Sequence, residues 1–181
     1  MRIVQKLKKA AGFKTNEDGN ASIEFAILLP LFVIVFVSTF EVGMAMTRLT
    51  VLEHGLDVTV RAMRLGTGAE YEHDDIRDMV CDNASMLDEC YETLQVELVR
   101  IDPDTWVMPA EDATCVRRAS TAEPLITFRD NGGAPNDIMF MRVCYVVDPM
   151  YPAIGLGSLL TVDASGAMQL IAETAFAQEP S

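Results

Sequence analysis

Gly19-Asn20-Ala21-Ser22-Ile23-Glu24-Phe25 ends a short basic segment and opens the apolar run that decides the fold of this chain. From Phe25 to Met46 the run has 22 residues and one charged side chain, Glu41. A helix of that length extends for roughly 33 Å, which is enough to cross the hydrocarbon core of a bilayer. A carboxylate at position 24 is unfavourable at the edge of lipid, so Glu24 indicates a role beyond spanning the membrane.

The charges on the two sides of this run are unequal. Residues 1–19 hold two acids and five basic residues: Arg2, Lys6, Lys8, Lys9 and Lys14. The remaining chain has nine arginines, no lysine and 25 acids. The positive-inside rule therefore predicts that the N-terminus is cytoplasmic and that the residues beyond the run lie outside. The acidic outer part has no basic stripe to neutralise phosphates, which argues against a nucleic-acid partner.

The helical pattern continues beyond the apolar run. Apolar residues recur there at steps of three or four, as in an amphipathic helix: Leu49, Leu52, Leu56, Val60 and Met63. We predict one continuous helix from about Ser22 to Leu65, roughly 66 Å long, that passes through Pro30 and ends at Gly66. The predicted organisation is a basic cytoplasmic leader (1–19), a transmembrane helix (20–47), its amphipathic continuation (48–65) and an outer α+β domain (66–181).

A cleaved secretory signal is the alternative for the apolar run. Such a signal has a shorter apolar region of roughly 7–15 residues, followed by a small-x-small cleavage site. Gly43-Met44-Ala45 fits that site weakly. Because the helical pattern passes through these residues without a break, it favours a helix that is retained.

Four cysteines lie beyond the run: Cys81, Cys90, Cys115 and Cys144. An even number in a small translocated domain indicates two disulfides. A structural zinc site is the alternative, but such sites usually contain a close ligand pair, and the chain has no Cys-x-x-Cys. Of the three possible pairings, Cys81–Cys90 with Cys115–Cys144 closes the shortest loops, so we predict this pairing.

The outer part of the chain predicts a small disulfide-stabilised α+β domain. Asp74 and Asp75 are N-cap candidates for a short helix with apolar residues at helical spacing. Alternating patterns predict strands near residues 94–99 and 138–147, and residues 168–176 form a final strand or a helix. We expect one or two helices packed against a three- or four-stranded antiparallel sheet.

No catalytic group, metal site or cofactor is predicted. His54 and His73 lie near neither a cysteine nor a serine motif. The acids between Glu70 and Asp75 do not have the spacing of an EF-hand loop, and Gly155-Leu156-Gly157 lacks the third glycine of a dinucleotide-binding fingerprint. The apolar stretch 150–160 is either part of the core or a patch that faces the membrane or a partner subunit.

Gly19 followed by Glu24 resembles the leader of type IV prepilins, in which cleavage after the glycine makes the acid the fifth mature residue. The longer pattern GNASIEFA (19–26), LLPL (28–31) and EVG (41–43) resembles the N-terminal signature of TadE/TadG-like proteins. MRVCY (141–145) and ETAF (173–176) resemble the ends of the same proteins. The resemblance implies a non-enzymatic pseudopilin or minor pilin of the tight-adherence (Tad, Flp) pilus system.

The resemblance also implies partners and a location. A prepilin peptidase would cut between Gly19 and Asn20, and Glu24 and Phe25 would act in recognition or assembly. The further partners are other Tad pilins or pseudopilins, the inner-membrane assembly platform and the lipid bilayer. The expected location is the bacterial inner membrane, which the chain crosses once, with the C-terminal domain in the periplasm. The resemblance allows both a protein that is associated with the pilus and one that is not.

Glu24 and Glu41 each have two interpretations. Cleavage gives Asn20 a new α-ammonium, and two charges at the lipid boundary are less costly when they are paired. We expect Glu24 to pair with the Asn20 ammonium of a neighbouring subunit. The alternative is a lone acid in the first turn of the helix, where the helix dipole favours it. Glu41, at the outer end of the span, is either structural or partner-facing.

Two other classes of protein are weighed against the pilus component. One is a single-pass, membrane-anchored periplasmic domain that binds a ligand or partner and keeps its N-terminus. The other is a secreted hydrolase with a signal peptide, which the missing catalytic groups argue against. The sequence of the mature N-terminus separates all three.

Overall fold

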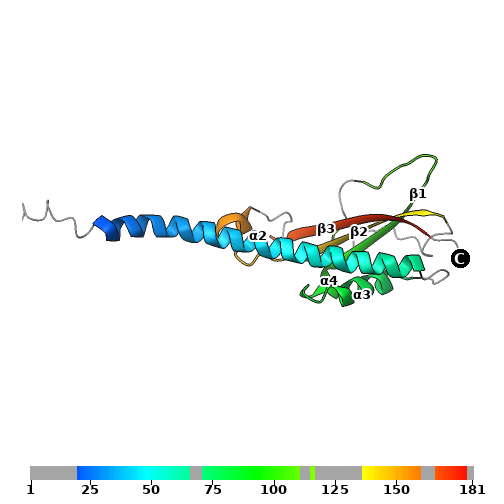
Figure 1. Cartoon of the computed structure of the whole chain (residues 1–181), viewed down its shortest axis with the longest axis horizontal. Helices are drawn as coiled ribbons and strands as arrows, with labels where there is room; N and C mark the ends of the chain where they lie inside the picture. The colour runs from blue at the N-terminus through cyan, green and yellow to red at the C-terminus, as the bar shows by residue number, and fades with distance from the viewer. Residues whose placement is uncertain (1–19, 66–70, 111–114, 117–135, 160–165, 179–181) are drawn as a thin grey trace, which may run out of the picture.

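The structure is a computed structural model that describes residues 20–65, 71–110, 115–116, 136–159 and 166–178. Its elements follow in the order α2 (Asn20–Leu65), α3 (His73–Asn83), α4 (Cys90–Thr93), β1 (Leu94–Ile101), β2 (Ile138–Val147), the 3₁₀ turn η1 (Gly155–Ser158) and β3 (Met168–Ala177). Figure 1 shows that the N-terminal half of α2 projects away from the rest, while its C-terminal half lies along the sheet. The predicted α+β fold with a long N-terminal helix is confirmed.

The long helix is continuous for 46 residues and passes through Pro30. It begins two residues before the predicted start and ends at Leu65, the predicted last residue. The predicted amphipathic stripe is confirmed, because Leu52, Leu56, Val60 and Met63 are all buried. The two ends of α2 therefore meet different surroundings: its second half is part of the core, whereas residues 21–36 are all exposed.

The sheet has three antiparallel strands in the order β1-β2-β3 within the described residues. Residues 168–177 form a strand, which decides between the strand and the helix that the sequence allowed. The register pairs Val96 with Val143 and Val143 with Ala172. Alternation along β2 sends Met139, Met141, Val143 and Tyr145 to the face that packs with α2 and α3.

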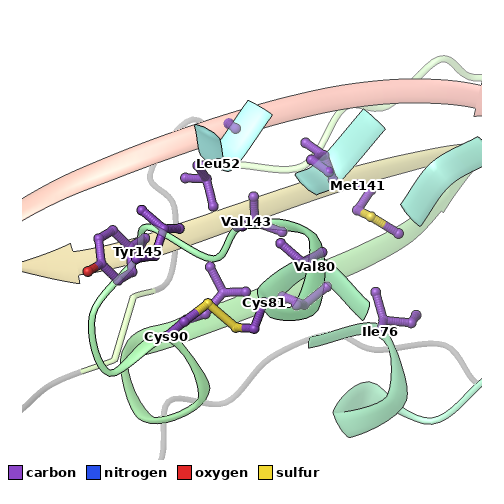
Figure 2. Packing of buried hydrophobic residues seen from close by; sticks show 14 of the residues in the cluster. Leu52, Ile76, Val80, Cys81, Cys90, Met141, Val143 and Tyr145 are labelled. Atoms are coloured by element: carbon purple, nitrogen blue, oxygen red, sulfur yellow. A yellow bond between two sulfur atoms is a disulfide. The ribbon is translucent and has the colours of Figure 1, made fainter. Parts of the chain in front are cut away.

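The short helix α3 packs beneath the long helix and covers the same core. Its residues Ile76 and Val80 are fully buried, and Figure 2 shows them below Leu52 and Val143, with the Cys81–Cys90 disulfide on the other side of Val80 from Ile76. The prediction that Asp74 or Asp75 is the N-cap of this helix is wrong, because the N-cap of α3 is Glu72. Asp75 is the third helical residue, and its carboxylate accepts a hydrogen bond from the Glu72 backbone N–H at 3.0 Å.

Both predicted disulfides are confirmed with the predicted pairing. Cys81–Cys90 joins the end of α3 to the start of α4. Cys115–Cys144 fastens the segment after β1 to the central strand, on the face of the sheet opposite the main core. Each bridge therefore stabilises a part of the domain that lacks a long helix or strand of its own.

A buried arginine crosses that opposite face. Arg142 is the register partner of Glu97 on one side and of Glu173 on the other. Its Nε donates to Glu173 Oε1 at 2.6 Å, and its Nη1 donates to Glu97 Oε2 at 3.3 Å and to the Ala110 carbonyl at 2.8 Å. Because its side chain is only 6% exposed, this charge depends on these partners.

Replacing Arg142 with methionine tests this dependence. Arg142→Met removes the cation that lies between two carboxylates and the donor to the Ala110 carbonyl, so we expect the free energy of unfolding to fall by about 3 kcal/mol. The matched control is Arg100→Met, because Arg100 pairs with Asp137 but its side chain is 46% exposed. That change should cost less than about 1 kcal/mol. Urea unfolding in detergent micelles, followed by circular dichroism, measures both losses of stability. Equal losses would show that Arg142 does not depend on its partners more than an exposed arginine does.

Candidate functional site

The N-terminal part of α2, residues 21–36, is an apolar helix whose residues are all exposed. Large side chains are exposed on every side of it, from Ile23 through Phe36. Ala21–Leu65 is the one helix in the described part of the chain that is long and apolar enough to cross a membrane, and its most apolar window has a mean hydropathy of 2.4 and is 0% buried. A helix that is apolar all round requires lipid or other helices around it. This surface is the candidate site for membrane insertion and assembly.

The residues expected to be processed lie at the start of this helix. Gly19 falls outside the described residues, and Asn20 is the first residue of α2. Glu24 lies one turn further on, in the second turn of α2. The alternative interpretation of Glu24, a lone acid in the first turn of the helix, is therefore wrong about its position. The side chains of Glu24 and Phe25 are both exposed. Both are therefore available to lipid or to another subunit rather than to their own domain.

Glu41 is placed quite differently, because it is buried to 1% exposure. Its Oε1 accepts a hydrogen bond from the Met150 backbone N–H at 2.9 Å, and its Oε2 accepts one from the Tyr151 N–H at 3.1 Å. Three residues earlier on α2, Ser38 Oγ accepts a hydrogen bond from the Leu156 N–H at 3.2 Å. Of the two interpretations of Glu41, the structure supports the structural one: the carboxylate fastens the segment before η1 to the long helix.

Two glycines allow the chain to lie this close to α2. Gly155 has a φ of +68°, and a Cβ there would collide with Ser38 Oγ. A Cβ on Gly157 would collide with the Tyr151 carbonyl oxygen and lie 3.6 Å from Glu41 Cδ. The Gly-Leu-Gly triplet thus belongs to a tight loop packed on a helix. Sequence reasoning missed this contact, although an isolated acid in an apolar helix and an uncharged glycine-containing loop are its two signals.

The histidines form no catalytic arrangement among the described residues. His54 is exposed on α2, and the His73 ring lies between Gln95 Nε2 at 3.1 Å and Asp74 Oδ1 at 3.2 Å. The hydrogen bond from His73 and the nearby Arg77 guanidinium lower the pKa of Asp74 from its usual value. Within the described ranges, no group of three His, Cys, Asp or Glu side chains could hold a metal ion.

The fold defines a class of protein: a small α+β domain carried on a long N-terminal helix whose residues 21–36 are apolar and exposed. Residues 19–61 match the family model described as TadE-like protein, which confirms the resemblance over the segment that holds Gly19, Glu24 and Glu41. That family indicates a component of a Tad pilus system. The match covers about a quarter of the chain and ends within α2. No curated protein and no solved structure matches the chain.

The Glu41 contact gives a direct prediction. Glu41→Leu removes the acceptor of two backbone N–H groups, and a hydrogen bond to a charged group is worth about 1.5–3 kcal/mol. We therefore expect amide hydrogen exchange at Met150 and Tyr151 to accelerate at least about tenfold, since each 1.4 kcal/mol is a factor of ten. Glu53→Leu is the matched control, because Glu53 is an exposed acid on the same helix. Unchanged exchange in Glu41→Leu would show that the carboxylate does not hold this segment.

Proposed function

We propose that this chain is a non-enzymatic, pseudopilin-like component of Tad pilus biogenesis, cleaved by a prepilin peptidase after Gly19 and assembled through the first half of α2. The observation that carries the proposal is the uncovered apolar half-helix, together with a TadE-like match that begins at Gly19 and includes Glu24. A carboxylate one turn into such a helix is unfavourable for a simple anchor and useful for pairing between subunits. The partners are the peptidase, other Tad pilins or pseudopilins and the inner-membrane assembly platform.

The proposed topology is a single pass through the bacterial inner membrane. The basic residues of the leader stay in the cytoplasm, and the sheet domain lies in the periplasm. Two disulfides in the domain fit an oxidising compartment. The contacts of Ser38 and Glu41 with the domain argue against a signal peptide cut after Ala45, because that cut would remove both residues from a folded protein.

Glu24 is proposed to act in assembly. Cleavage would leave an α-ammonium on Asn20, the residue at which α2 begins. A carboxylate on a neighbouring helix, displaced by about one turn, would neutralise that charge where both are poorly solvated. Side chains on a helix lean toward its N-terminus, so Glu24 also points toward its own Asn20. Pairing between subunits is the form that promotes assembly, and crosslinking between copies distinguishes the two forms.

The mature N-terminus tests the processing. We expect Asn20 as the first residue of the wild-type protein in its native host. Gly19→Leu should leave full-length protein, because a side chain blocks the close backbone approach that glycine permits. Gly43→Leu is the matched control: a Cβ at Gly43 meets nothing within 4 Å, so this variant should still be cleaved. An intact Met1 in the wild type would favour an unprocessed anchored domain, and cleavage after Ala45 would indicate a signal peptide; either result overturns the proposal.

Glu24→Val tests the assembly role. The variant should be cleaved and membrane-bound, since the change removes a charge from the edge of the lipid. Pilus formation, or crosslinking of the protein to its partner subunits, should be lost, because the Asn20 ammonium is left unpaired among packed helices. Glu53→Val, at an exposed acid in the second half of α2, should keep both. Wild-type pilus numbers from cleaved Glu24→Val protein would refute the pairing.

A further inference from the structure

The segment that Glu41 fastens to α2 is apolar on its exposed surface as well as at its contact. Residues 149–159 contain no charged side chain. Five large hydrophobic residues of this segment are more than a third exposed: Met150, Tyr151, Ile154, Leu156 and Leu159. Leu159 is 76% exposed. We call residues 149–159 the apolar loop. An exposed apolar patch of this kind marks a contact with lipid or with another protein.

The apolar loop is held in place rather than loosely attached. Glu41 binds two of its backbone N–H groups, and Ser38 binds a third at Leu156. The glycines at 155 and 157 remove the side chains that would push the loop away from the helix. Figure 1 shows the loop, coloured orange, against the middle of α2 where the projecting half of the helix begins. Its exposed side chains therefore have a fixed position along the helix.

That position coincides with the level at which a hydrocarbon core of about 30 Å ends when α2 enters it at its first residues. A helix that enters the hydrocarbon at Ala21 has risen about 30 Å by Phe40, which is the thickness of the core of a bilayer. Ser38 and Glu41, which hold the loop, lie at this level. Phe36 and Phe40 are exposed on α2 at the same level. A groove lined by helix residues and by Leu156 joins the two apolar surfaces: Ile34, Val35, Ser38, Thr39, Val42 and Leu156.

We propose that the apolar loop inserts into the outer interface of the same bilayer that α2 crosses, so that the domain rests on the membrane. Tyr151 suits this depth, because its ring is apolar and its hydroxyl can reach water. The loop offers no charge to lipid headgroups, so the surface it fits is the boundary of the acyl chains rather than an anionic lipid. Lipid then ends near Phe40, about two turns before the end of the expected span 20–47. The proposal rests on the membrane span of α2, but not on cleavage or pilus assembly.

Depth-dependent quenching of single tryptophans tests the proposal. The full chain carries Trp106→Phe, which removes its one tryptophan, and a new tryptophan at one chosen site. The protein is reconstituted at one copy per nanodisc of phosphatidylcholine with brominated acyl chains. Leu159→Trp should be quenched at least about twofold and shift its emission to the blue. Leu65→Trp is the matched control, because Leu65 is 69% exposed and lies at the far end of α2. It should not be quenched.

A third variant separates the possible failures. Ile27→Trp reports on the span itself, about 9 Å from its inner edge, and should be quenched strongly in every preparation. Without quenching at Ile27, α2 does not span the bilayer, and the proposed topology fails together with the inference. Quenching at Ile27 without quenching at Leu159 overturns the inference alone. If emission from Leu159→Trp shifts to the blue only when several copies share a nanodisc, without quenching by lipid, the loop is a subunit interface, and the inference is again wrong.

Discussion

The structure depends on one helix meeting two different burial requirements. The second half of α2 places Leu52, Leu56 and Met63 against a sheet that would otherwise expose its apolar face. Residues 21–36 of the same helix pack on no part of the described domain, so their apolar side chains need lipid or other helices. The helix is continuous. The lipid or the helices that surround its N-terminal part therefore also determine the orientation of the domain and its distance from them.

Glu41 marks the point where these requirements change. A carboxylate in an apolar helix is costly unless its oxygens are satisfied, and here both oxygens accept backbone N–H groups from a segment more than a hundred residues later. The two hydrogen bonds compensate the cost of the charge and hold the segment before η1 against the helix. Glu24 has no comparable partner within the described part of the chain and is exposed. The two acids of the apolar segment thus differ in kind: Glu41 accepts hydrogen bonds within the subunit, whereas the side chain of Glu24 is exposed.

The domain itself is stabilised on both faces of a small sheet. One face packs with α2 and α3 around Val143, and the other holds Arg142 between two carboxylates and the Cys115–Cys144 bridge. The three strands of the described residues, α3 and the second half of α2 make a limited core, so covalent bridges and a buried ion pair contribute a larger share of the stability than in a large domain.

The sequence by itself determined the features that follow from local periodicity and short spacings. The step of three or four residues identified the buried stripe from Leu52 to Met63, alternation identified β2, and loop length selected the disulfide pairing. The motif at Gly19 and Glu24 pointed to the TadE-like match. Only the tertiary structure decided that residues 168–177 form a strand, that Arg142 lies between Glu97 and Glu173, and that Glu41 binds the segment before η1. The physical reason is distance along the chain: these partners lie 21 to 110 residues apart, and no local pattern records which of them folding brings together.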